Sequence, residues 1–466
     1  MQQRAILSLF IICFFSFSSF AQQGDKASRL HRSATGVLLT DGQNGNDTGS
    51  VVLTLTDCLH YALKNQPALN QSFIDEAIAQ KNNQIALSAW LPQVTGAANY
   101  EHYFQLPFVY STINGQLTGI TSGVANTSIP SITATQTLFS PDVLLAAKAA
   151  KFNTKLAQQN TMGTRIDLVS EVSKAFYDLL LSVEQIGVYK EDTARLKKNQ
   201  SDAYYQYKSG VVDKVDYKQA TITLNNSLSQ LKTATEAVNA KYATLKQLMG
   251  FPSDRSFTVN FDTTQMMQEI VIDTLAPLQV EKRIEYQQQQ TARILQHETT
   301  AYYELGFLPS VYAFYNYNYE FESNQFSSLY DHAYPYSLFG VQLNIPIFTG
   351  LKRIEQVRKA KLVETRTDWD EVNLRLTIYA QYSQALASYK SNLYYLHTQG
   401  ENVQMAREVY DIVKLQYREG IKPYLDVIVA ESDLQTSEIS YLNALFQVLQ
   451  SKIDLEKAMG DIPTNI

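Results

Sequence analysis

The same short motif occurs twice in the chain, about 210 residues apart. Residues 206–216 and 416–426 have Gln, Tyr, Gly and Asp at matching offsets, and each motif lies between two long polar segments with helical periodicity. A glycine at the end of a helix can adopt the left-handed conformation through which the chain reverses direction. Pro423 suits the first turn of a following helix, where its missing N–H does no harm. The motif therefore predicts two helical hairpins with tips at Gly210 and Gly420.

The segments that lead into the two tips predict unusually long helices. Residues 142–208 contain no proline and only two glycines, and a similar segment runs from Gly350 to the second tip. At 1.5 Å per residue, roughly 65 residues make a helix of about 100 Å, which is far longer than a globular domain uses. After each tip, in residues 224–249 and 434–459, apolar residues recur in steps of four and three. This spacing is typical of a coiled-coil seam.

Extended segments follow the Leu-Pro pairs at positions 91–92 and 308–309, which end the preceding helical segments. The predicted strands cover about residues 95–110, 129–139, 310–322 and 337–348. Residues 111–128, rich in Gly, Ser, Thr and Asn, are predicted to form a loop. In the second pair a tyrosine-rich face alternates with a polar face, and about ten residues is enough for a tilted strand to cross a bilayer. A soluble sheet packed on helices would produce the same alternation.

The chain is therefore predicted to be a duplication of one unit: helix, strand, strand, very long helix, tip, helix. The predicted parts are a signal peptide at 1–21, a flexible leader at 22–52, a first repeat at 53–250, an equatorial linker at 251–274, a second repeat at 275–460 and a tail at 461–466. The first helix of the second repeat is expected at 275–305.

The N-terminus has the composition of a secretory signal peptide. A basic Arg4 precedes an apolar run that ends at a small-x-small site, Ser19 to Ala21. The run is shorter than the roughly 20 residues that a membrane anchor needs. Cleavage after Ala21 would leave Cys58 as the only cysteine, which excludes an intramolecular disulfide and suits a small core residue.

Several functional classes lack their sequence signals. No basic block suggests nucleic-acid binding, and the net charge is -6. The six histidines are scattered, and His297-Glu298 lacks the second histidine of a zinc helix. No nucleophile elbow or phosphate loop is present. We therefore predict no catalytic residues, no metal and no cofactor, and a protein that is not an enzyme.

The predicted strands require more than one copy of the chain if they lie in a membrane. Backbone groups in lipid must all be paired, so an open four-stranded sheet cannot persist there. Natural spanning barrels have at least about eight strands, so three chains with four strands each would form a barrel of about twelve. The helices of each half have matched lengths and would continue the barrel as a water-filled tube.

Together these features resemble the TolC-like outer-membrane efflux family. The resemblance is carried by Leu55-Thr56-Asp57-Cys58-Leu59, Asn65-Gln66-Pro67, both Leu-Pro pairs, Leu138-Phe139-Ser140, Ile347-Phe348-Thr349-Gly350 and both Gly tips. It covers about residues 53–460. It implies a mainly α-helical fold with membrane β-strands: a homotrimer whose twelve-strand barrel in outer-membrane lipid continues as a long helical barrel through the periplasm.

The resemblance also implies a function. The tips would meet a periplasmic adaptor attached to an inner-membrane pump, and the trimer would be a passive exit duct for efflux or type I secretion. The competing prediction is a secreted, soluble coiled-coil protein with a structural or interaction role.

Residues at the tips acquire roles through this resemblance. Those expected to contact the adaptor are Gly210, Val211, Val212, Gly420 and Ile421. The alternative is a hairpin that needs glycine only to turn. Exposed valine and isoleucine at a turn have no core to join, which favours the contact role.

The resemblance further implies a gate that closes the tunnel near the tips. Tyr417 and Asp216 match a tyrosine–aspartate pair of the family, whereas Lys422 replaces an arginine and faces Val215 at the partner position. Asp426 matches one ring of aspartates that would favour cations. The alternative is that Asp216 and Asp426 are first-turn carboxylates that stabilise helix N-termini by about 0.3–1 kcal/mol.

Overall fold

The computed structural model describes residues 51–113, 116–259, 266–267 and 269–464. The predicted signal peptide and the leader up to residue 50 lie outside these residues. Residues Val52–Ile466 form one compact unit, with a short strand at its start.

Helices dominate the described chain, in the duplicated order that the sequence predicts. They are α2 (Leu55–Asn65), α3 (Pro67–Ser88), α4 (Pro141–Lys208), α5 (Lys214–Met249), α7 (Ile284–Leu305), α8 (Lys352–Arg418) and α9 (Tyr424–Met459), with short 3₁₀ turns η2 (Val280–Lys282) and η3 (Phe326–Ser328). The two long helices, α4 and α8, have 68 and 67 residues. This confirms the prediction of two helices far longer than those of a globular domain.

Four strands form one antiparallel sheet in the order β2-β5-β7-β8. The strands are β2 (Gln93–His102), β5 (Asn126–Phe139), β7 (Ser310–Ser323) and β8 (Ala333–Asn344). The two halves of the chain meet at the β5–β7 pairing, where Ile132 lies opposite Tyr317. β2 and β8 are therefore the edges of the sheet. A separate two-stranded sheet joins β1 (Val51–Leu53) and β6 (Phe257–Val259).

The first predicted strand pair differs from the observed one. The strand expected at 95–110 ends at His102, and the residues expected to be a loop contain a second hairpin, β3 (Phe108–Ile113) and β4 (Gln116–Thr121). Pro107 lies just before β3 and cannot donate a hydrogen bond to a ladder, so it separates the two strands. The loop prediction was wrong because threonine, which is frequent in these residues, suits a strand as well as a loop.

Two further boundaries differ for the same chemical reason. The last strand ends at Asn344 rather than near residue 348, because Pro346 lacks the N–H that a ladder needs. The helix expected to start at residue 275 starts at Ile284. Pro277 disfavours the helical conformation at the residue before it, and a 3₁₀ turn at Val280–Lys282 precedes α7.

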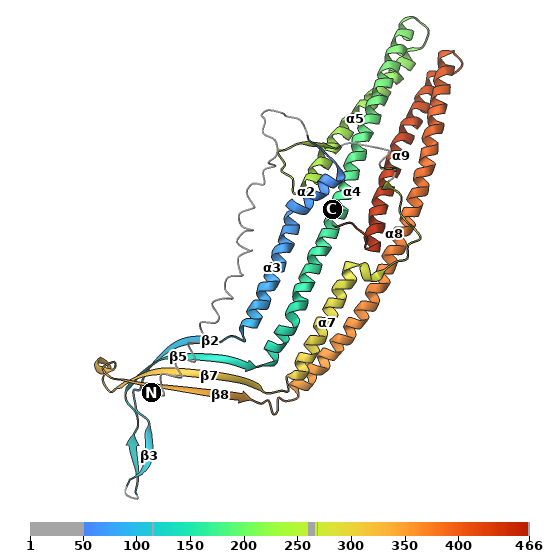
Figure 1. The fold of residues 1–466 in the computed structure, drawn as a ribbon. Helices are drawn as coiled ribbons and strands as arrows, with labels where there is room; N and C mark the ends of the chain where they lie inside the picture. The colour runs from blue at the N-terminus through green and yellow to red at the C-terminus, as the bar shows by residue number, and fades with distance from the viewer. Residues whose placement is uncertain (1–50, 114–115, 260–265, 268, 465–466) are drawn as a thin grey trace. The chain divides into compact units, whose positions relative to one another are not determined.

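The two hairpins lie side by side, and the sheet lies at the end of the helices away from the tips (Figure 1). We call α4 with α5 the first hairpin and α8 with α9 the second hairpin. α4 also packs along α9, so the hairpins touch over part of their length. The main core lies where α2, α4, α5, α8 and α9 meet, and includes the fully buried Leu179, Leu245 and Leu445. A smaller core lies nearer the tips, around Tyr424 and Leu434.

The sequence features of these helices explain their packing. Most of the predicted seam of α9 is buried, and Cys58 is a fully buried core residue as expected. Burial raises the pKa of the Cys58 thiol to about 12, so it remains an unreactive thiol. Among the described residues, no helix combines the length and the apolar character needed to cross a bilayer.

Candidate functional site at the hairpin tips

The two tips have the same backbone structure. In each, the glycine N–H donates to the tyrosine carbonyl three residues earlier, and the next N–H donates to the glutamine carbonyl five residues earlier. Gly210 has φ 76° and Gly420 has φ 74°, the left-handed conformation that other residues adopt at a cost. A Cβ added at either glycine would meet no atom within 4 Å. Backbone conformation alone therefore requires glycine at these positions.

Apolar side chains project from both tips into solvent. Val211 is 72% exposed and Ile421 is 71% exposed, each directly after its glycine, while Val212 is half-buried. Val215 and Leu425 lie one turn further on and are also exposed. Exposed apolar groups clustered in this way are typical of a surface that a partner covers.

Tyr417 connects the two hairpins close to the tips. Its hydroxyl donates a hydrogen bond of 2.8 Å to the Gln206 side-chain oxygen on α4, and its ring packs on Tyr424. Burial, with the nearby charges of Asp216 and Asp202, raises the pKa of Tyr417, so the phenol keeps its proton at neutral pH. The predicted partner Asp216 therefore acts on Tyr417 through its charge, and the hydrogen bond goes to Gln206.

Lys422 and Asp426 form an ion pair within the second tip. Lys422 Nζ lies 3.2 Å from an Asp426 carboxylate oxygen, one turn further along, and both side chains are partly exposed. Such an exposed pair contributes a few tenths of a kcal/mol. Val215, at the position where the family has a polar partner, is an exposed apolar residue of α5. Asp216 and Asp426 both lie in the first turn of their helices, as the alternative role in stabilising an N-terminus requires.

A buried polar cluster lies between the hairpins, further from the tips. It consists of Asp192 and Arg195 on α4, Ser227 on α5, and Glu431 and Gln435 on α9. This cluster was not predicted from the sequence, because single acidic residues are common on the solvated faces of polar helices. One signal was present: Glu431 continues the steps of four and three in α9, three residues before the buried Leu434, and so occupies a position where an apolar residue is expected.

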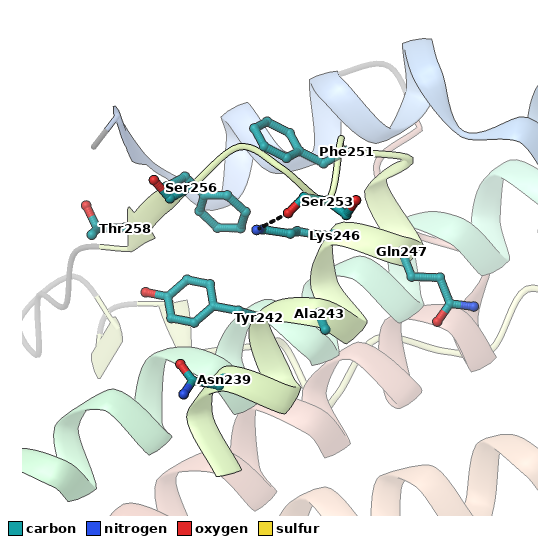
Figure 2. Close-up of a pocket in the computed structure, with 10 residues that line it drawn as sticks. Asn239, Tyr242, Ala243, Lys246, Gln247, Phe251, Ser253, Ser256 and Thr258 are labelled. Atoms are coloured by element: carbon teal, nitrogen blue, oxygen red, sulfur yellow. Dashed lines mark hydrogen bonds between the residues drawn. The ribbon is translucent and has the colours of Figure 1, made fainter. Parts of the chain in front are cut away.

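One further hollow, of about 550 Å³, lies beside the end of α5 (Figure 2). The aromatic rings of Tyr242, Phe251 and Phe257 pack edge-on around it. Lys246 donates to the carbonyl of Ser253, and it is the one charged side chain among the lining residues that the structure describes. Its described lining residues thus include no acid–base pair.

Comparison with known proteins gives a consistent result. The family model described as "Outer membrane efflux protein" matches residues 58–251 and 284–461, which are the two repeats without the segment that joins them. "Outer membrane efflux protein BepC" of Brucella suis biovar 1 (strain 1330) is 22% identical over 446 residues, which cover 89% of this chain and 87% of that protein.

Solved structures share the fold. CusC superposes with a TM-score of 0.72 at 15% identity, covering 90% of this chain and 95% of CusC. The CmeC outer membrane channel of Campylobacter jejuni superposes with a TM-score of 0.71 at 18% identity, covering 92% of each chain. These likenesses confirm the predicted fold class, in which a duplicated helical unit carries the strands of a membrane sheet.

Proposed function

Because the chain belongs to the outer membrane efflux protein family, we propose that it is the exit channel of a tripartite efflux or type I secretion system. In this role it is a passive homotrimer whose helical part lies in the periplasm. The family consists of channels rather than enzymes, and its location in the outer membrane excludes the competing prediction of a secreted soluble protein.

The observation that carries the proposal is the open four-stranded sheet. Among the residues that the structure describes, neither edge strand, β2 or β8, pairs with a further strand on its outer side, and all ten residues of β2 are exposed. On β8 the exposed Phe339, Val341 and Leu343 share one face, as a strand facing lipid requires. An unpaired edge cannot persist in lipid. Pairing β8 of one chain with β2 of the next closes the sheet, and three chains with four strands each give a barrel of about twelve strands.

A stripe on α8 supports the same assembly. Apolar side chains recur along one face in steps of seven, three, four and three, and all of them are exposed in the single chain: Leu362, Trp369, Val372, Leu376 and Tyr379. This spacing is that of a coiled-coil seam without its partner helix. A neighbouring copy would cover it in a closed tube of helices.

The tips support the remaining parts of the proposal. We assign Gly210, Val211, Val212, Gly420 and Ile421 to the contact with a periplasmic adaptor that is bound to an inner-membrane pump. We assign Tyr417, Asp216, Lys422 and Asp426 to the gate. The hydrogen bond between Tyr417 and Gln206 is a direct link between the hairpins and would have to break when they separate.

The test is to isolate outer membranes from expressing cells, extract the protein in mild detergent, and measure the mass and the single-channel conductance of the particle. A conducting particle with the mass of three chains is expected. A monomer recovered in the soluble fraction would remove the barrel, and the channel with it.

A further inference from the structure

The buried cluster joins three helices through charged groups. Arg195 Nε on α4 donates to a Glu431 carboxylate oxygen on α9 at 3.3 Å, and Asn199 donates to the other oxygen at 2.9 Å. Asp192 on α4 accepts from Ser227 of α5 at 2.7 Å and from Gln435 of α9 at 2.8 Å. A second Arg195 nitrogen lies 3.6 Å from Asp192. One guanidinium is therefore shared between two carboxylates.

The charges of this cluster do not balance when both carboxylates are ionised. Asp192 and Glu431 are each only 2% exposed, and Arg195 is the one cation that forms an ion pair with either of them among the described residues. A buried excess charge is costly, and the cluster removes it most simply by holding one proton. Burial, followed by the charge of Asp192, raises the pKa of Glu431 to about 7, while Arg195 opposes the rise. Burial also raises the pKa of Asp192.

Neighbouring titratable groups adjust this balance without removing it. Burial and the charge of Glu431 raise the pKa of Tyr424 on α9, and burial and the charge of Asp192 raise the pKa of Tyr189 on α4, so both phenols stay neutral. From α8, Lys414 favours the ionised form of Glu431, although its ammonium donates to Tyr410. Glu438 on α9 disfavours ionised Asp192, but Arg407 of α8 pairs with Glu438 at 2.8 Å. Ser227 and Thr193 add no charge: the Ser227 hydroxyl donates to Asp192 and shares a hydrogen bond with the Thr193 hydroxyl.

We propose that Asp192, Arg195 and Glu431 form a proton-dependent clamp, which holds the second hairpin against the first and weakens when Glu431 is ionised. The proposal rests on the proposed function, because a gated channel requires the hairpins to separate near the tips. Glu431 lies on α9, seven residues after the helix begins at Tyr424 and about 10 Å along it. The three residues are thus positioning residues for the tip carrying Tyr417, Lys422 and Asp426, which they do not touch directly.

The direction of the pH effect follows from the two states of Glu431. In the closed cluster its pKa is near 7, whereas in separated, hydrated hairpins it would return to an ordinary value of about 4.3. Between these values the closed state holds a proton that the separated state has lost. Raising the pH through this window therefore favours separation, by up to about tenfold per pH unit in each chain. Below and above this window both states bind the same number of protons, so the equilibrium between closed and separated hairpins no longer changes with pH.

Distances between the tips test the clamp without requiring a pore. Spin labels attached at Val211→Cys and Ile421→Cys, both exposed, would report the spread of the hairpins by double electron–electron resonance in the full chain in detergent. The buried Cys58 would not be labelled. Between pH 5.5 and 7.5 the ratio of long to short distances should rise on the order of tenfold.

Two variants and a matched control distinguish proton linkage from simple loss of packing. Glu431→Gln keeps an oxygen for Asn199 but cannot ionise, so its distance ratio should not depend on pH. Asp192→Asn removes the repelling charge and should move the midpoint to lower pH. Asp433→Asn changes an exposed carboxylate on the same helix and should keep the wild-type profile.

A wild-type distance ratio that does not depend on pH, or a Glu431→Gln variant that follows the wild-type profile, would overturn the clamp. A monomeric, non-conducting particle would overturn the proposed function instead.

Discussion

At the scale of single residues, the Tyr417 hydroxyl is the smallest group whose removal should alter the proposed gate. Tyr417→Phe keeps the ring on Tyr424 and removes only the hydrogen bond to Gln206. A half-buried hydrogen bond contributes about 0.5–1.5 kcal/mol, so the equilibrium between closed and open tips should shift toward open by about 2- to 13-fold. Single-channel recording in planar bilayers measures this shift as an increase in open probability.

Tyr205→Phe is the control for this experiment, because it removes a phenol from the largely exposed Tyr205 on the same helix as Gln206. It should leave the open probability unchanged. Equal effects of the two substitutions would assign the change to general perturbation of the tip rather than to the link between α8 and α4.

The role of a residue could be predicted from the sequence only where the residue belongs to a repeated motif or to a regular spacing. Tyr417 and the glycines stand in a repeated motif, so their neighbourhood could be predicted. Gln206 was part of that motif, yet its role as acceptor depends on how far α8 approaches α4, which no spacing along the chain encodes. Glu431 interrupts an apolar seam, and its partners Asp192 and Arg195 lie more than 230 residues away in sequence.

At the scale of elements, the tip glycines should behave differently from a glycine within α4. Gly420→Ala forces a residue with a Cβ into the left-handed conformation at a cost of about 1–2 kcal/mol, although space is available. Hydrogen exchange of the backbone amides at the second tip should accelerate by about 5- to 30-fold, while exchange at the buried part of α9 stays unchanged.

Gly187→Ala provides the matched control with the opposite sign. Gly187 lies inside α4, and an added Cβ would meet no atom within 4 Å. The substitution should stabilise the helix by about 1 kcal/mol and slow local exchange. If Gly420→Ala slowed exchange as well, the argument from backbone conformation would be wrong.

Element boundaries were predictable where backbone chemistry alone decides them. The long helices and their tips follow from the absence of proline and the placing of glycine, and the structure agrees within a few residues. The β3–β4 hairpin was missed because its composition is shared by strands and loops, and only pairing between residues 108–113 and 116–121 distinguishes them. Helical periodicity alone predicted too early a start for α7: Pro277 disfavours helix at Ala276, and the helix begins only at Ile284, after a 3₁₀ turn.

At the scale of the whole molecule, the proposed need for other copies follows from four strands and the rules of a bilayer, both available from the sequence. The surface that those copies would cover could not be predicted from the sequence, because apolar periodicity in α8 does not say which of its faces is already buried within the same chain. In the structure Ile378, Tyr389 and Leu396 face the chain's own core. The stripe from Leu362 to Tyr379 remains exposed on α8 and has the spacing of a seam.

Charges placed on this stripe should therefore prevent assembly while the single chain still folds. Trp369 and Leu376 are 69% and 65% exposed in the single chain, so replacing both with glutamate removes little of its own core. In a trimer each would lose about 1.5–3 kcal/mol of apolar burial and place a charge in a packed seam, which costs more. Native mass spectrometry in detergent should show monomers in place of trimers, and circular dichroism should show that the helical content is retained.

Thr377→Glu is the control, because it adds the same charge to an exposed position about a third of a turn from the stripe and should leave the trimer intact. A double variant that remained trimeric would mean that α8 does not meet its neighbour through this stripe, and that the open edges of the sheet hold the copies together alone.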